Sequence, residues 1–163
     1  MDGSTVIAFD KDKEKIILVK RRDIPVWVIP GGGIEKGEYP EHAAIRETKE
    51  ESGFDIKIVR KVAEYTHIGS HKKNHLFEAV VIGGEARINN EAKEVNFFAL
   101  DNLPEPRHPH LDDWLADLKQ GSQSIIKKEI QGFTIKQALR QIHKHPIAVF
   151  RFILTRFGIR IDT

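Results

Sequence analysis

Apolar and β-branched side chains recur in short runs over the first hundred residues, and these runs predict a β-rich domain. Residues 5–10 (TVIAFD) and 15–22 (KIILVKRR) predict two strands, and the polar KDKE between them predicts a hairpin. Residues 26–30 (VWVIP) predict a third strand that runs into three glycines, whose simplest interpretation is a tight turn before a helix. Further strands are predicted at 54–68, 75–84 and 94–100.

Apolar residues spaced by three and four predict helices in the other segments. Residues 41–52 (EHAAIRETKEES) predict a helix, since Pro40 suits its first turn and Gly53 its C-terminal end. Residues 110–120 predict a second helix from the spacing of their leucine and tryptophan side chains. The same spacing predicts a helix at 133–145, and the run after it, IAVFRFILTRFGIRI, also places apolar side chains on one helical face.

The composition is that of a soluble protein with room for one hydrophobic core. Of its 163 residues, 40% are hydrophobic and 31% are charged, so one domain with an appendage is expected. The absence of cysteine excludes disulfides, thiolate zinc sites and cysteine nucleophiles, and it agrees with a cytoplasmic location. No apolar run has the length of a signal peptide's core or of a transmembrane helix, which needs about 18 residues.

Charge is distributed unevenly along the chain. Residues 1–118 carry 17 Lys and Arg against 22 Asp and Glu, a net charge of −5. Residues 119–163 carry 9 against 2, a net charge of +7. We therefore predict a boundary near residue 119, with one domain at 1–120 and a basic, helical extension at 121–163.

Three glutamates of the predicted helix at 41–52 form the least expected feature of the sequence. Glu47 precedes Glu50 by three residues and Glu51 by four, so their side chains share one helical face. Like charges at this spacing destabilise a helix by a few tenths of a kcal/mol per pair. Clustered carboxylates are the ligands that Mg²⁺ prefers, and a glycine turn beside them lets a carbonyl or a substrate approach. The pattern therefore predicts a cation site, although an ordinary solvated helix face is the alternative.

Residues 32–54 resemble the signature motif of the Nudix hydrolase family, and the similarity extends over about residues 4–118. Eight of the nine specified positions match. The exception is Thr48, where the family usually has an aliphatic residue, and we expect its hydroxyl to bond a main-chain carbonyl one turn back. The matching residues are Gly32, Glu38, Arg46, Glu47, Glu50, Glu51, Gly53 and Phe54.

The resemblance implies a fold, a reaction and a set of ligands. The fold would be α/β, a Nudix α/β/α sandwich with a mixed β-sheet. The reaction would be the hydrolysis of a pyrophosphate bond in a nucleoside diphosphate linked to another moiety, a small-molecule polyphosphate substrate, with Mg²⁺ or Mn²⁺ as cofactor. The metal ligands implied are Glu47, Glu50 and Glu51, together with the carbonyl of Gly31 or Gly32.

The same resemblance implies catalytic roles for other residues. Arg46 is expected to orient a glutamate through a charge-assisted bond, and Glu38 to support the loop before the helix. The general base varies among relatives. Glu47 is the first candidate within the motif, and Glu91 and Glu94 are the candidates in a later loop.

Basic side chains near the motif are candidates for binding the phosphates of the substrate. Arg21 and Arg22 end a strand just before the motif, so one of them is placed to reach a phosphate, or both are simply solvated. His71, Lys72 and Lys73 lie in a loop between two strands that lead toward the site. This loop is either a phosphate clamp or a solvated turn.

Markers of individual subfamilies leave the substrate open. The proline that often follows the motif in ADP-ribose hydrolases is absent, and Tyr65 falls too early for the tyrosine of dinucleoside polyphosphate hydrolases. The entry VWVIPGGG and the basic loop are similar to diphosphoinositol polyphosphate phosphohydrolases. A dinucleoside polyphosphate hydrolase and a non-catalytic nucleotide sensor are also compatible with the motif, but sensors usually lack a glutamate that this chain retains.

The basic extension lies outside the resemblance, and three interpretations compete for it. It packs back on the domain, it forms the interface of a homodimer, or it lies on an anionic membrane surface as an amphipathic helix. We do not expect a nucleic-acid partner.

Overall fold

The computed structural model describes every residue except 122–123, 132–134, 136–138, 140–142, 160 and 162–163. Its main feature is an eight-stranded mixed sheet, in which six strands follow the order β3-β2-β1-β6-β5-β8. The remaining two strands pair at the side of this path, β4 with β1 and β7 with β2. The strands are β1 (Gly3–Phe9), β2 (Lys15–Arg21), β3 (Trp27–Val28), β4 (Gly31–Gly33), β5 (Phe54–His67), β6 (Lys73–Gly84), β7 (Ala92–Ala99) and β8 (Ile126–Ile130).

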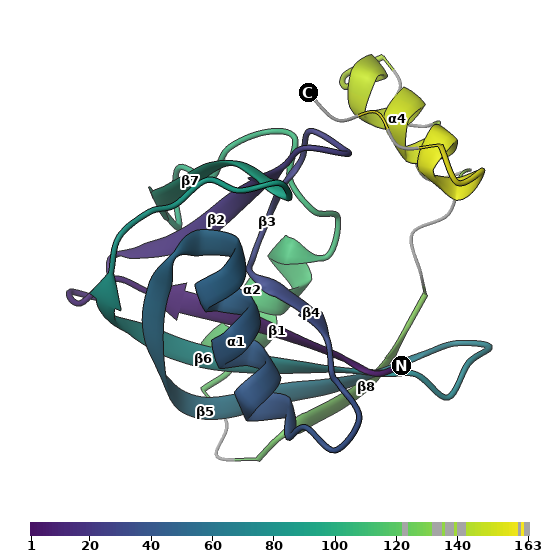
Figure 1. Cartoon of the computed structure of the whole chain (residues 1–163). Coiled ribbons are helices and arrows are strands. Elements are labelled where there is room, and N and C mark those ends of the chain that lie inside the picture. Colours follow the sequence, from purple (N-terminus) through teal and green to yellow (C-terminus); the bar gives the residue numbers. More distant parts are fainter. Residues whose placement is uncertain (122–123, 132–134, 136–138, 140–142, 160, 162–163) are drawn as a thin grey trace.

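Alternate side chains of the central strands face two separate cores. Ile7 and Phe9 belong to one cluster of buried side chains, and Val6 and Ala8 belong to the other. Successive residues of a strand point to opposite faces, so the sheet has a core on each side. Helix α1 (Pro40–Ser52) covers one face and α2 (Leu111–Lys119) covers the other (Figure 1). The predicted α/β/α sandwich with a mixed sheet is therefore confirmed.

Helix α1 is fixed to the sheet at its first residue, and its buried side satisfies its own polar groups. It begins at Pro40 and is followed by Gly53, as predicted. The hydroxyl of Ser4 in β1 donates a hydrogen bond to the Pro40 carbonyl at 2.7 Å. Thr48 is fully buried, and its hydroxyl donates to the Ala44 carbonyl at 2.7 Å, which is the partner one turn back that the sequence predicted. The hydroxyl that Thr48 brings in place of an aliphatic side chain is thus hydrogen-bonded within the helix.

The glycines after the third strand were predicted as a turn, and this prediction is wrong. Gly31–Gly33 form strand β4, which pairs antiparallel with the start of β1. A Cβ on Gly31 would lie 2.4 Å from the Ser4 carbonyl oxygen, so only glycine allows the two backbones to approach this closely. The third strand is correspondingly shorter than predicted, because only Trp27–Val28 pairs with β2.

The extension was predicted to be helical, but its first described element is a strand. Ile126–Ile130 pairs in parallel with β5, and both end residues pack against the core under α2. Burial of these isoleucines outweighs the weak local preference of a five-residue segment. The boundary near residue 120 therefore does not separate the extension from the sheet.

The second part of the extension is helical. Helix α4 (Pro146–Arg156) lies beside the β2–β3 end of the sheet, apart from α1 and α2 (Figure 1). The helix predicted at 133–145 falls largely outside the described residues. No helix in the described part of the chain is long and apolar enough to cross a bilayer. Homodimer formation and membrane contact stay predictions.

An ion pair between a buried carboxylate of α2 and a half-exposed lysine of β8 fastens these two elements together. Asp117 is 2% exposed, accepts a hydrogen bond from the Tyr65 hydroxyl at 2.8 Å, and pairs with the Lys128 ammonium. A carboxylate this deeply buried needs both partners, because removing one partner of a buried pair leaves an uncompensated charge.

We expect Lys128→Ala to lower the free energy of unfolding by about 2 kcal/mol, because it leaves the Asp117 charge unbalanced. Lys127→Ala removes the neighbouring exposed lysine and is expected to change stability by less than about 0.5 kcal/mol. Urea denaturation of both variants measures the difference. Equal stability of the two variants would show that the Asp117 pair does not hold β8.

Candidate active site

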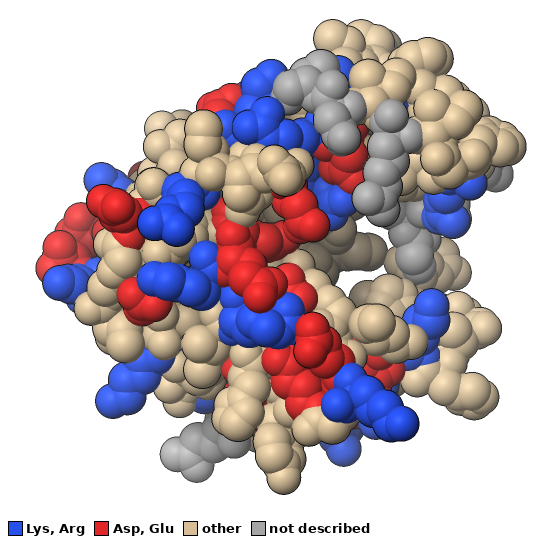
Figure 2. Space-filling view, viewed as in Figure 1, with Lys and Arg blue, Asp and Glu red and all other residues tan. Residues whose placement is uncertain are grey.

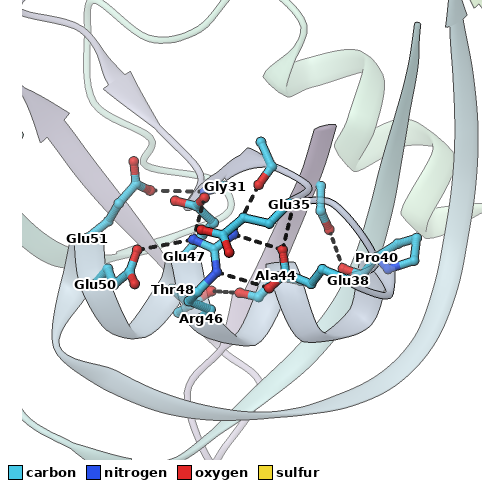
Figure 3. Close-up of polar contacts among 12 residues, drawn as sticks. Gly31, Glu35, Glu38, Pro40, Ala44, Arg46, Glu47, Thr48, Glu50 and Glu51 are labelled. Atoms are coloured by element: carbon cyan, nitrogen blue, oxygen red, sulfur yellow. Dashed lines mark hydrogen bonds and ion pairs between the residues drawn. The ribbon is translucent and has the colours of Figure 1, made fainter. Parts of the chain in front are cut away.

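Arg46 on α1 joins three of the four glutamates of the motif, Glu38, Glu47 and Glu50, to the strand of glycines. Its Nε and Nη2 donate to the two carboxylate oxygens of Glu38, each at 3.0 Å, and Nη1 donates to Glu47 at 2.8 Å and Glu50 at 3.2 Å (Figure 3). Its Nη2 also donates to the Gly33 carbonyl at 3.0 Å. One guanidinium thus fixes the carboxylate face of the helix against β4 and the loop that follows it.

Two glycines of β4 contact glutamates of α1, Gly32 by leaving space for a side chain and Gly31 through its main-chain N–H. A Cβ on Gly32 would lie 2.4 Å from the carboxyl carbon of Glu47. The main-chain N–H of Gly31 donates to Glu51 at 2.9 Å (Figure 3). These contacts explain why glycine is needed here, because any side chain on Gly32 would displace the Glu47 carboxylate.

Electrostatics at this face are unfavourable for negative charge. Burial is the main cause that raises the pKa of Glu51 to about 7; the charges of Glu47 and Glu91 act in the same direction, and the hydrogen bond from Gly31 and the charge of Arg21 oppose it. Burial also raises the pKa of Glu47, and the adjacent Arg46 opposes that rise. Figure 2 shows acidic side chains forming a nearly continuous run across the side of the molecule that carries α1.

The pKa of Glu38 is shifted in the opposite direction. Its hydrogen bonds with the Arg46 guanidinium lower its pKa to about 2, and the Glu35 main-chain N–H contributes in the same direction at 2.9 Å. Glu38 is therefore a permanently charged partner of Arg46, whereas Glu51 sits where a proton or a cation is needed.

The donor set fits a hard divalent cation, although the side chains are engaged elsewhere. Within the described residues, no three His, Asp or Glu side chains converge on one point that could hold a metal ion. Glu47 and Glu50 are bonded to Arg46, and Glu51 is bonded to Gly31. Crowded carboxylates that raise one another's pKa are nevertheless the environment that a bound dication relieves.

The loop before β7 brings Glu91, but not Glu94, to this face. The Asn89 side chain donates to the Glu50 carbonyl at 2.6 Å and ties the loop to the end of α1. Glu91 acts electrostatically on both Glu47 and Glu51. Glu94 instead forms an ion pair with Lys20 at 2.7 Å, across the β2–β7 pairing. Sequence reasoning missed Asn89, because an amide in a polar loop carries no distinguishing pattern.

The predicted phosphate-binding residues are divided between two places. Arg21 forms an ion pair with Asp23, and its charge acts on Glu51, so it lies near the carboxylate face. Arg22 donates from Nε to the Asn89 carbonyl at 2.8 Å and supports the loop.

His71, Lys72 and Lys73 lie at the tip of the β5–β6 hairpin, which projects past the start of β1 (Figure 1). Lys73 pairs with Glu64 at 2.7 Å, and its N–H donates to Asp2 at 3.0 Å. Contact of this tip with phosphate stays a prediction.

Known proteins share both the sequence and the fold. The family model of the NUDIX domain matches residues 1–118. The chain is 32% identical over 124 residues to a Bacillus subtilis (strain 168) protein provisionally named 8-oxo-dGTP diphosphatase, covering 76% of this chain and 83% of that protein. It is 40% identical over 146 residues to an ADP-ribose pyrophosphatase of the same organism, covering 85% of this chain and 75% of that protein.

A solved structure supports the same assignment. The crystal structure of an ADP-ribose pyrophosphatase from Streptococcus suis 89-1591 superimposes with a TM-score of 0.63 at 26% identity, covering 78% of this chain and 97% of that one. The family match spans well over half of the chain, and the motif residues lie together on α1 and β4. The chain therefore belongs to the NUDIX domain family and is a pyrophosphohydrolase.

Proposed function

We propose that the carboxylate face of α1 binds Mg²⁺ or Mn²⁺ and hydrolyses the pyrophosphate bond of a nucleoside diphosphate linked to another moiety. The ligands would be Glu47, Glu50 and Glu51, with a carbonyl from Gly31 or Gly32. The observation that carries this proposal is the pKa of Glu51, raised to about 7 by burial and by neighbouring carboxylates. A site whose carboxylates repel one another is suited to hold a cation between those carboxylates and a polyanionic substrate.

The bound cation would polarise the phosphoryl oxygens and acidify water. Residues of the chain would align the metal ligands and bind the phosphates. Arg46 keeps the glutamates aligned, and Arg21 provides a positive charge for a phosphate near Glu51. Of the two candidates for general base outside the motif, Glu94 lies in β7 and is engaged by Lys20, whereas Glu91 precedes β7 and acts on the carboxylate face. We therefore favour Glu91 over Glu94, with Glu47 as the candidate on the helix.

The substrate proposed is a nucleoside diphosphate sugar such as ADP-ribose. The relative named ADP-ribose pyrophosphatase is similar over 85% of this chain, which is more than the family match at 1–118 covers. The similarity between this relative and the chain therefore extends beyond residue 118, into the basic extension. The missing proline marker is the observation against this choice, and a panel with ADP-ribose, UDP-sugars, 8-oxo-dGTP and inositol pyrophosphates tests it.

Replacing Glu51 by Gln should reduce kcat/KM with Mg²⁺ by about 100-fold or more, because it removes a charged ligand while keeping the hydrogen bond to Gly31. Glu41→Gln is the matched control, since Glu41 is an exposed carboxylate in the first turn of the same helix. It should retain activity within about twofold. Phosphate release from the substrate panel measures both. Activity of Glu51→Gln equal to that of the parent would remove Glu51 from the site.

Exchanging each loop glutamate separates the candidates for the general base. Glu91→Gln should lower kcat by about 100-fold, the usual contribution of a general base, while Glu94→Gln should lower it by less than about threefold. Steady-state kinetics at saturating Mg²⁺ give both values. A larger loss in Glu94→Gln would reverse the assignment.

The metal-free protein should lose stability as pH rises through the titration of Glu51. Its folded pKa is about 7 and its ordinary value is 4.5, so the folded state binds more protons than the unfolded state between these values. The Glu51 contribution is present below pH 4.5 and is lost as pH rises through 7.

Glu51→Gln should therefore gain on the order of 2 kcal/mol in free energy of unfolding relative to the parent between pH 5 and pH 8. Urea denaturation with a chelator present measures this difference, in which the titrations of all other groups cancel. A difference that does not change with pH would mean that Glu51 is not protonated in the folded state.

A further inference from the structure

A cavity of about 240 Å³ lies between α4 and the body of the protein, beside Arg21. The body contributes Val26 and Val28 around β3, and the loop before α2 contributes residues 106–109. Helix α4 contributes Ala148, Val149 and Phe152 as the opposite wall. The cavity is therefore closed by the basic extension, the part of the chain beyond the family match at 1–118.

Specific contacts hold α4 in place over the cavity. Ala148 and Val149 face the body and are 8% and 5% exposed. The Arg151 guanidinium donates to the main-chain carbonyl of Arg22 at 3.0 Å, directly after the strand that carries Arg21. By contrast, Phe150 points away and is 59% exposed. The helix thus presents Ala148, Val149 and Phe152 to the cavity and Phe150 to solvent.

His108 provides a polar group within this mostly apolar lining. Its ring is stacked on Trp114, with 4.8 Å between centroids and 12° between planes. Burial lowers its pKa to about 4, with His110 and Arg21 acting in the same direction, so the ring is neutral. Its Nδ1 accepts a hydrogen bond from the His110 N–H at 3.2 Å, which leaves the proton on Nε2. The lining therefore combines apolar walls with the neutral ring of His108 and the guanidinium groups of Arg21 and Arg107.

Arg21 connects the cavity to the carboxylate face. It lines the cavity, and its charge acts on Glu51. A phosphate held by Arg21 would therefore lie between the proposed metal ions and the cavity. Pockets for drug-sized ligands usually measure about 300–1,000 Å³, so this smaller one suits a single ring system joined to that phosphate.

We propose that α4 completes a pocket for the base of the substrate's nucleoside, and that Phe152 determines how tightly the base is held. This inference rests on the proposed function, because it places the phosphate of the same substrate on Arg21. Aromatic contact with a base tolerates different bases, since every base has a π-face. The extension is then a specificity element of the enzyme and not a separate module.

Binding of AMP, UMP and ribose 5-phosphate to the full chain tests this proposal, with Mg²⁺ present and calorimetry as the measurement. Phe152→Ala should weaken AMP and UMP about tenfold and leave ribose 5-phosphate within about twofold, because only the nucleotides carry a base. Phe150→Ala is the matched control, an exposed phenylalanine on the same helix, and should change none of the three. Phe152→Leu keeps the packing of α4 and should give an intermediate loss, while circular dichroism checks the fold of each variant.

Three results would overturn the proposal. One is AMP binding that is unchanged in Phe152→Ala, the second is an equal loss for ribose 5-phosphate, and the third is no nucleotide binding by the parent protein. Hydrolysis is measured separately on the parent. Nucleotide binding that depends on Phe152, without hydrolysis of any member of the panel, would refute the proposed function and leave the base pocket standing.

Discussion

The rest of the site depends on the hydrogen bonds that the Arg46 guanidinium donates. A helix that gathers Glu47, Glu50 and Glu51 on one face destabilises itself, and a single guanidinium offsets that repulsion at its centre. The same group reaches Glu38 and the Gly33 carbonyl, so helix, loop and strand β4 are held as one unit. The clustered negative charge is tolerated here because the compensating charge is built into the same helix.

The Arg46 guanidinium offsets only part of this repulsion, because its hydrogen bonds to carboxylates go to Glu38, Glu47 and Glu50. Glu51 receives only a main-chain N–H from Gly31 and the more distant charge of Arg21, so its pKa stays near 7. A fully paired carboxylate such as Glu38, with a pKa of about 2, would have no need of a cation. The contrast between these two glutamates of one motif separates a fully paired carboxylate from one whose charge is poorly compensated.

Local patterns allowed the sequence to predict α1, most strands and the partner of the Thr48 hydroxyl, because each depends on neighbours within a few residues. The strand formed by Gly31–Gly33 was missed because its pairing with β1 depends on a segment far away in the sequence. Strand β8 was missed for the same reason, since Ile126–Ile130 becomes a strand only against β5. The proximity of Glu91, Arg21 and α4 to the site likewise follows from tertiary contacts that no periodicity encodes.

The stacking of His108 on Trp114 has a consequence for how the enzyme would respond to acidification. Histidine normally gains charge near neutrality, yet this ring would remain uncharged down to about pH 4. The charge of this ring would then be constant across the range of cellular pH. A neutral ring at the cavity and a glutamate with a pKa of about 7 at the carboxylate face would therefore respond differently to the same change of pH.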